Sequence, residues 1–313
     1  MRVLIDTDPG IDDAIALLLA LRSPELDVAG VSVVQGNVGI EAGTVNALRI
    51  LELSGRGEIP VAAGPPDPLV RQARRSELVH GSDGLADLGL ALPEGKPLDE
   101  YGPAFLIQML EAADERTTII ALGPLTNLAI VLLSAPHVVP RIERVVLMGG
   151  SVRWEGNITP AAEYNIHADP ESASIVFRSP VPTTMVGLNV TMRTILGKAE
   201  CERLAASEED IERLVGALGL HIVRIYERFY GIPGFALHDP LAVGVAIDPS
   251  LVRTERRHVL VDLSPGPTAG MTLVDFWGIP EPWGEPNADV ALEVDSERFL
   301  QMVSTRLFGR HPI

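Results

Sequence analysis

Four aspartates fall within residues 6–13 of the chain, namely Asp6, Asp8, Asp12 and Asp13. Carboxylates this close together repel one another and raise one another's pKa unless a cation lies among them. Oxygen ligands of this kind suit a hard divalent metal such as Ca²⁺ or Mg²⁺. The spacing of the aspartates therefore predicts a metal site.

The segments on either side of the aspartates predict where that site lies. Residues 3–5 are apolar and predict a buried strand, and the apolar-rich residues 11–21 predict a helix. The carboxylates then lie at the carboxyl end of the first strand and in the opening turn of the first helix. In open α/β sheets, ligands bind at this edge.

Helix capping is the alternative explanation for these aspartates. Asp8 followed by Pro9 resembles an N-cap with proline in the first helical position, and Asp12 and Asp13 would favour the positive end of the helix dipole. Capping explains one or two acids, and Asp6 alone is readily structural, but capping does not explain all four. We therefore favour the metal site.

The same pattern of an apolar strand followed by polar residues recurs along the chain. The apolar runs cover residues 28–34, 118–122, 144–148 and 183–188. Helical segments follow the first two runs, and continuous apolar strands alternating with helices predict a parallel sheet covered on both faces. We expect an α/β fold with one open, mainly parallel twisted sheet, a Rossmann-like core. A C-terminal extension, with strands near residues 259–263, 271–276 and 290–294, is expected to continue the sheet and close with a helix.

Composition limits the class of protein further. The chain has 313 residues, of which 46% are hydrophobic, and no linker divides it, so we expect a single domain over residues 1–313. A net charge of −17 argues against nucleic-acid or anionic-membrane partners. Cys201 is the only cysteine, which excludes an intrachain disulfide. No signal peptide is recognisable and the apolar residues 117–139 contain Gly123-Pro124, so we expect a cytoplasmic protein without a membrane span.

Two long connections between the predicted elements, and one motif late in the chain, also contain polar residues that could form a site. Residues 64–100 include His80, and residues 151–168 include Glu163 and Asn165. Long loops in a compact domain are often functional. His238 and Asp239 precede another helical run. The three tryptophans are expected to be structural or surface residues: Trp154, Trp277 and Trp283.

Taken in order, these motifs resemble the nucleoside hydrolases of the inosine–uridine-preferring family. The resemblance runs from residue 3 to about residue 305. It rests on the aspartate motif at residues 6–13, on Gly36-Asn37, on residues 123–127 and 148–150, on Glu163-Tyr164-Asn165 and on His238-Asp239. The family implies the nucleoside hydrolase fold and the hydrolysis of the N-glycosidic bond of ribonucleosides to free base and ribose.

The resemblance also assigns roles to matching residues. It implies that Asp8 is the general base that takes a proton from a calcium-activated water. The implied Ca²⁺ ligands are Asp8, Asp13, Asp239 and the backbone carbonyl of Leu122. The implied substrate-binding residues are Asp12, Asn37, Met148, Asn157, Glu163, Asn165 and Asn189, although many family members have aspartate at the last position. The groups implied around the leaving base are His80, Tyr226 and His238.

These residue types suit the chemistry without reference to the family. A cation lowers the pKa of bound water, and a nearby carboxylate takes the proton as the water attacks C1′. Carboxylates stabilise the oxocarbenium-like transition state. The departing base needs a proton or strong hydrogen bonds, which a histidine with a pKa near neutral can supply. His80 and Tyr226 each have a structural alternative: His80 as part of a loop that only closes over the site, and Tyr226 as a residue of the hydrophobic core.

Two other functions compete with this interpretation. An aspartate-nucleophile phosphohydrolase would use Asp6 and Asp8, but neither Lys96 nor Lys198 follows a convincing strand to anchor a phosphoryl group. A catalytically silent nucleoside- or calcium-binding protein is the second alternative, and the intact Asp8 disfavours it. The resemblance further implies a homo-oligomer, a dimer or tetramer. His238, where the purine-restricted branch has tryptophan, favours a broad or pyrimidine-tolerant enzyme.

Overall fold

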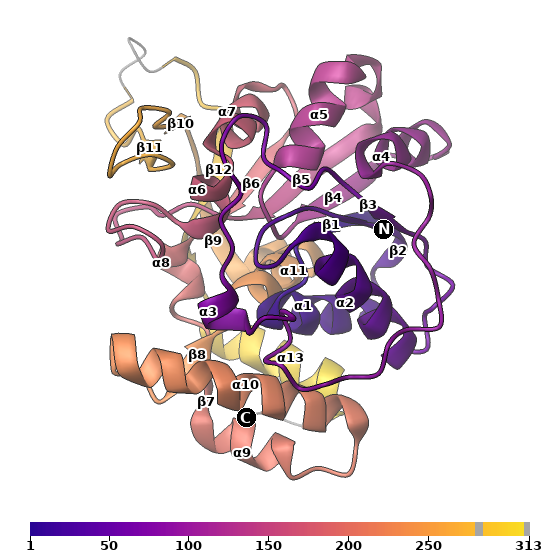
Figure 1. The fold of residues 1–313 in the computed structure, drawn as a ribbon. Helices are drawn as coiled ribbons and strands as arrows, with labels where there is room; N and C mark the ends of the chain where they lie inside the picture. Colours follow the sequence, from indigo (N-terminus) through magenta and orange to yellow (C-terminus); the bar gives the residue numbers. More distant parts are fainter. Residues whose placement is uncertain (279–283, 310–313) are drawn as a thin grey trace.

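A twisted sheet of eight strands lies at the centre of the part of the chain that the structure describes (Figure 1). The structure is a computed structural model that describes residues 1–278 and 284–309, so Trp283 lies outside the described residues. In sheet order the strands are β3 (Val61–Ala63), β2 (Asp27–Val33), β1 (Arg2–Thr7), β4 (Thr117–Ala121), β5 (Ile142–Met148), β6 (Thr183–Val186), β12 (Ala288–Val294) and β9 (Val252–Arg257).

The strand order changes direction at β1, which places a ligand-binding edge there. Strands β1, β2 and β3 run outwards to one side, whereas β4 pairs with the other side of β1. All neighbouring pairs are parallel except β12 with β9. The crevice beyond the carboxyl ends of β1 and β4 is therefore a topological switch point. The predicted open, mainly parallel sheet is confirmed.

Helices cover both faces of the sheet, as expected (Figure 1). They are α1 (Ile11–Leu21), α2 (Ile40–Leu53), α3 (Glu77–His80), α4 (Gly102–Glu111), α5 (Thr126–Ser134), α6 (Tyr164–Ala168), α7 (Pro170–Arg178), α8 (Leu188–Thr191), α9 (Lys198–Ala205), α10 (Asp210–Tyr230), α11 (His238–Ile247) and α13 (Ser296–Phe308). Two 3₁₀ turns, η1 (Pro136–Arg141) and η2 (Pro249–Leu251), add to them. Among the helices described, none combines the length and the apolar character that crossing a bilayer requires.

Side chains that alternate along the strands form two hydrophobic cores. Val3 and Ile5 on β1 belong to the core shared with α1, α2, α10, α11 and α13. Leu4 between them belongs to the opposite core, with α4, α5 and α7. This alternation follows from the two-residue period of a strand. Because both faces are buried, β1 is apolar throughout until it reaches the aspartates.

The C-terminal extension follows the prediction in part: β12 joins the main sheet and α13 follows it, whereas the other two predicted strands do not join. β10 (Val259–Val261) and β11 (Thr272–Val274) pair only with each other in a separate antiparallel sheet, and the edge of the main sheet is β9 instead. Val259 and Val261 are buried in the core that contains α7, so packing on that helix draws this hairpin away from the sheet. Two further short strands, β7 (Ile195–Gly197) and β8 (Gly234–Ala236), also form their own pair.

Candidate functional site

Four buried aspartates meet at the switch point, and we call them the carboxylate floor: Asp8, Asp12, Asp13 and Asp239. Asp8 follows β1, Asp12 and Asp13 lie in the first turn of α1, and Asp239 lies in the first turn of α11. Carboxylate oxygens of Asp12, Asp13 and Asp239 lie within 4.8 Å of one another. None of the four is more than 9% exposed. Among residues 1–278 and 284–309, no lysine or arginine forms an ion pair with them.

Asp13 has a structural role as well as a place in the floor. Its Oδ2 accepts hydrogen bonds from the backbone N–H of Gly10 at 3.0 Å and from Nδ2 of Asn37 at 3.0 Å, and its Oδ1 accepts one from the Thr7 hydroxyl at 2.5 Å. The bond to Gly10 caps the first turn of α1. Capping and ligation are therefore compatible for this residue.

Asp8 keeps one carboxylate oxygen without a partner. Its Oδ2 accepts a hydrogen bond from the backbone N–H of Asn37 at 2.7 Å, whereas Oδ1 is buried and unpaired among the described residues. A Cβ at Gly36 would lie 2.0 Å from Oδ2, so only glycine fits there. A buried unpaired carboxylate oxygen is costly in water-free surroundings and suits a cation ligand.

The buried carboxylates of the floor repel one another. Burial, and then the charge of Asp13, raises the pKa of Asp8 well above its usual value and that of Asp12 to about 7. Burial, and then repulsion from Asp12, Asp13 and Asp8, raises the pKa of Asp239 in the same direction. A divalent cation among these oxygens would remove the repulsion. The all-oxygen donor set fits a hard cation and not zinc.

The carbonyl expected to complete the ligand set is also present. Leu122 follows β4, and its carbonyl oxygen accepts a hydrogen bond from Nδ2 of Asn165 at 2.6 Å. The most compact acidic trio contains Asp12 in place of the expected Asp8. We retain Asp8 in the ligand set because of its unpaired oxygen, and the structure adds Asp12 as a neighbour of the same site.

A cavity of about 140 Å³ opens next to the floor. Its walls bring together the predicted residues Asp12, Asn37, His80, Leu122, Met148, Asn157, Glu163, Asn165, Tyr226, His238 and Asp239. Asp8 and Asp13 are fully buried beside it. Residues that lie far apart in the sequence thus share one cavity.

One side of the cavity is formed by oriented polar side chains of the connection after β5. Glu163 caps α6, and its carboxylate accepts hydrogen bonds from the backbone N–H groups of Asn165, Ile166 and Gly150. Burial nevertheless raises its pKa to about 7. Asn157 accepts a hydrogen bond from the backbone N–H of Tyr164 at 2.8 Å. This side offers several fixed acceptors and donors to the hydroxyl groups of a ligand.

The opposite side, which we call the histidine–tyrosine wall, consists of His80, Tyr226 and His238. Nδ1 of His80 accepts a hydrogen bond from the backbone N–H of Ile11 at 3.0 Å. Burial lowers the pKa of His80 to about 3, so the ring is neutral at pH 7 and carries its proton on Nε2. A Cβ at Gly10 would lie 2.6 Å from this Nδ1, which explains the glycine in the aspartate motif.

His238 lies between two hydroxyl groups. Its Nε2 is 2.7 Å from the Tyr226 hydroxyl, and its Nδ1 is 2.7 Å from Oγ1 of Thr191. Burial lowers the pKa of His238 to about 4 and raises that of Tyr226. The structure therefore differs from the expectation of a histidine with a pKa near neutral, because burial favours the neutral form of both rings.

Several lining residues were not foreseen from the sequence. Ile222 and Tyr230 lie four residues before and after the predicted Tyr226 on α10 and line the cavity with it, and the ring centroids of Tyr226 and Tyr230 lie 5.1 Å apart. This spacing was a readable signal, since residues four apart share a helix face. Thr191 had no comparable signal in the sequence.

Asn189 is the one predicted substrate-binding residue that the structure does not bring to this cavity. Its Nδ2 donates to the carbonyl of Ala291 at 2.8 Å, and the residue lines a different cavity. The strand before it ends at Val186, and the single turn of α8 turns successive side chains by about 100° each. Thr191, two residues later, reaches His238 instead.

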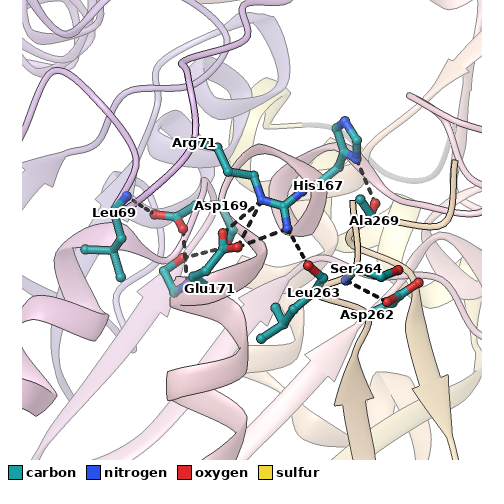
Figure 2. A network of polar contacts seen from close by, with 10 residues as sticks. Leu69, Arg71, His167, Asp169, Glu171, Asp262, Leu263, Ser264 and Ala269 are labelled. Carbon is teal, nitrogen blue, oxygen red and sulfur yellow. Dashed lines mark hydrogen bonds and ion pairs between the residues drawn. The ribbon is translucent and has the colours of Figure 1, made fainter. Parts of the chain in front are cut away.

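A polar network holds the segment that leads to His80 (Figure 2). Arg71 donates to both carboxylate oxygens of Glu171 and to the carbonyl of Leu263 at 3.0–3.1 Å. The backbone N–H of Leu69 donates to Asp169, which caps α7. Further along, Ser76 donates its backbone N–H to the carbonyl of Asn37. Residues 69–76 are thus fixed to α7 on one side and, on the other, to Asn37, which contacts the floor.

Comparison with known proteins agrees with this geometry. A family model described as inosine-uridine preferring nucleoside hydrolase matches residues 3–301. The chain is 40% identical to a pyrimidine-specific ribonucleoside hydrolase RihA from Salmonella paratyphi A, over 98% of both chains. It is 37% identical to a probable uridine nucleosidase 2 from Arabidopsis thaliana, over 98% of this chain and 97% of that one.

Solved structures show the same similarity. A plant nucleoside hydrolase, PpNRh1, aligns over 99% of both chains with a TM-score of 0.94 and 37% identity. A purine-preferring ribonucleoside hydrolase from Gardnerella vaginalis aligns over 99% of this chain and 98% of that one, with a TM-score of 0.92 and 34% identity. The fold is that of a nucleoside hydrolase. The chain belongs to the inosine-uridine preferring nucleoside hydrolase family.

Proposed function

We propose that this nucleoside hydrolase cleaves pyrimidine ribonucleosides such as uridine, with Ca²⁺ held in the carboxylate floor and Asp8 as the general base. The observation that carries the proposal is the buried, unpaired Oδ1 of Asp8 among three other carboxylates. The ligands would be Asp8, Asp13, Asp239 and the carbonyl of Leu122. When bound, the cation would lower the pKa of an adjacent water and offer sites to ribose hydroxyls.

Asp8 accepts the proton of the attacking water. Its Oδ2 is held by Asn37, which leaves Oδ1 to accept the proton as the water oxygen bonds to C1′ and the C1′–N bond breaks. The positive charge that develops on the ribose ring is stabilised by the surrounding carboxylates, among them Asp12 and Glu163.

The ribose is held by the polar side of the cavity. Asp12 lines the cavity next to the metal site, and Asn157, Glu163 and Asn165 lie around it. Hydrogen bonds that already fix these side chains orient their free oxygens and nitrogens. A preorganised arrangement of this kind favours a ligand with hydroxyls at matching positions.

The departing base is stabilised by hydrogen bonds from the histidine–tyrosine wall, which offset the negative charge that develops on the base as the C1′–N bond breaks. If Thr191 donates to Nδ1 of His238, then Nε2 of His238 donates to the Tyr226 oxygen, and the Tyr226 hydroxyl proton is free to point at the base. Such a chain of hydrogen bonds polarises the terminal donor. Nε2–H of His80 is a second donor in the same wall.

The preference for pyrimidines is supported by two relatives, which are named pyrimidine-specific ribonucleoside hydrolase and probable uridine nucleosidase. It also agrees with His238 at the position where tryptophan would favour purines. The cytoplasmic location and the dimer or tetramer that the resemblance implies stay predictions.

Ribose release from uridine tests this proposal directly. Protein treated with a chelator should lose about 10³-fold or more in kcat/KM, and added Ca²⁺ should restore it whereas Zn²⁺ should not. Full activity in protein that elemental analysis shows to be metal-free would overturn the metal assignment. No ribose release from the Ca²⁺-loaded protein would favour the catalytically silent nucleoside-binding protein.

A further inference from the structure

A second and larger cavity, of about 600 Å³, lies at the β9 edge of the sheet. Its walls come from the connection after β5, from the segment after α8 and from β9 and β12. We call it the arginine cavity after its characteristic side chains, Arg153, Arg193, Arg253 and Arg257, which lie with Trp154 and Phe276. Four arginines in one cavity are notable in a chain whose net charge is −17.

Positive charge exceeds negative charge in this cavity. Arg253 pairs with Glu255 at 2.7 Å and with Glu293 at 2.6 Å, and Arg257 pairs with the same Glu255. These two glutamates are the carboxylates of the cavity wall, so four guanidinium groups face two carboxylates. The cavity therefore carries an excess of about two positive charges.

Arg153 and Arg193 account for this excess. Within the described parts of the chain, neither forms an ion pair within 4.0 Å of a carboxylate, although the pKa of Glu293 is lowered first by its paired arginine and then by the charge of Arg193. Arg153 lies over the Phe276 ring with its Cζ 3.8 Å from the ring centroid, and the Arg257 Cζ is 5.3 Å from the same centroid. Both of these guanidinium groups thus lie close to one aromatic ring, and hydrogen-bond donors remain free for a ligand.

Two further features of the wall indicate a ligand site. Arg153 has φ of +51°, a left-handed conformation that is rare for a residue with a Cβ and that often marks functional segments. Asn189 is buried, yet its Oδ1 has no hydrogen-bond partner among the described residues, and this acceptor suits a hydroxyl or N–H group of a nucleotide rather than its phosphate oxygens. Trp154, which is 47% exposed, supplies an aromatic face, and the Ser151 hydroxyl holds its backbone carbonyl at 2.7 Å.

We propose that the arginine cavity binds a phosphate group, carried by a nucleoside 5′-monophosphate or present as free phosphate. Guanidinium groups bind phosphate through paired hydrogen bonds, which favours an oxyanion over a neutral nucleoside. The indole of Trp154 would stack on the base of a nucleotide. This site is separate from the catalytic cavity and goes beyond the hydrolysis proposed above.

The binding test uses tryptophan fluorescence of the full-length protein at low ionic strength, titrated with UMP, inorganic phosphate or uridine. UMP should change the emission saturably, phosphate should compete with it, and uridine should not. Arg153→Gln and Arg193→Gln should each weaken UMP binding by about 10-fold or more. Arg56→Gln is the matched control, because Arg56 pairs with Glu58 outside this cavity.

The remaining variants and outcomes distinguish the ligand sources. Trp154→Phe should remove the optical signal while calorimetry still detects UMP binding. Phosphate that binds as tightly as UMP would support the site and identify free phosphate as its ligand. The absence of saturable binding to the wild type would overturn the proposal. So would UMP binding that uridine displaces or that both arginine variants retain, because the nucleotide would then occupy the catalytic cavity.

Discussion

The carboxylate floor and the histidine–tyrosine wall of the catalytic cavity are built from different kinds of structure. The floor lies at strand ends and first helical turns, with three of its four residues supplied by residues 8–13. The wall is assembled from α3, α10 and the start of α11, all of which follow residues 8–13 by more than 60 residues in the sequence.

The two regions also differ in their electrostatics. Burial raises the pKa of the carboxylates in the floor and lowers that of the two histidines in the wall. A cation would remove the repulsion within the floor, whereas the wall consists of neutral groups linked by hydrogen bonds. A site that hydrolyses an N-glycosidic bond can thus separate two tasks, the activation of water and the stabilisation of the departing base by hydrogen bonds.

Replacement of Asp8 should have the largest effect. Asp8→Asn removes the general base and weakens the metal site, so kcat should fall by about 10⁴-fold or more on both uridine and a riboside with a nitrophenolate leaving group. Steady-state kinetics on both substrates measures this loss. Near wild-type turnover in metal-loaded Asp8→Asn protein would show that the floor does not activate water through this residue.

Removal of the 2′-hydroxyl from the substrate tests whether Asp12 and the metal bind the ribose. A site built to bind a hydroxyl leaves polar groups unpaired when that hydroxyl is missing, and such discrimination reaches about 10⁴-fold. We expect kcat/KM for 2′-deoxyuridine to be lower than that for uridine by up to this factor. Similar values for the two nucleosides would contradict the assignment of Asp12 and the metal to the ribose.

Variants of the wall should separate its task from that of the floor. His238→Ala and Tyr226→Phe break the same chain of hydrogen bonds and should each lower kcat on uridine by about 10²-fold. A nitrophenyl riboside needs no proton on its leaving group, so both variants should cleave it nearly as well as the wild type. Equal losses on the two substrates would mean that these residues shape the floor instead.

The stability of the metal-free protein should depend on pH in a direction set by the floor. The carboxylates with raised pKa are Asp6, Asp8, Asp12, Asp13, Glu163 and Asp239. Between about pH 5 and pH 7 they hold protons in the folded state that the unfolded chain releases, so the free energy of unfolding falls as the pH rises. The lowered pKa values of His80 and His238 act in the opposite direction, but they are outnumbered.

Thermal unfolding of chelated protein measures this effect. The Tm at pH 5.5 should exceed that at pH 7.5 by about 5 °C or more, and Ca²⁺ should reduce the difference because it lowers the pKa of its ligands. A Tm of the metal-free protein that rises with pH over this range would contradict the charge balance described for the floor.

The smallest effect is expected for the network that holds the segment before His80. Arg71→Ala removes the bonds to Glu171 and Leu263, and the loosened segment should raise the KM of uridine by about threefold to tenfold with little change in kcat. Arg56→Ala is the control. A change in kcat on the nitrophenyl riboside, as large as that on uridine, would show that the network supports the floor as well.

Much of the floor could be predicted from the sequence, because local spacing determines it. An apolar strand followed by a turn and a helix places Asp8, Asp12 and Asp13 at one strand end, and parallel strands bring the following strand ends to the same edge. That is also why the open sheet and the position of Leu122 were predictable. The glycines of these motifs follow from the close approach of Asp8 and His80.

The wall and the outer parts of the fold were decided by tertiary packing. Thr191 and His238 are 47 residues apart, and no local pattern indicates that their side chains meet. The pKa values of the histidines depend on burial by distant segments, and the β10–β11 hairpin leaves the sheet because its valines pack on α7. The sequence alone determined which strand ends carry carboxylates, since chain geometry links neighbours. Only the folded structure decided what faces them, because contacts between distant segments depend on how the whole core packs.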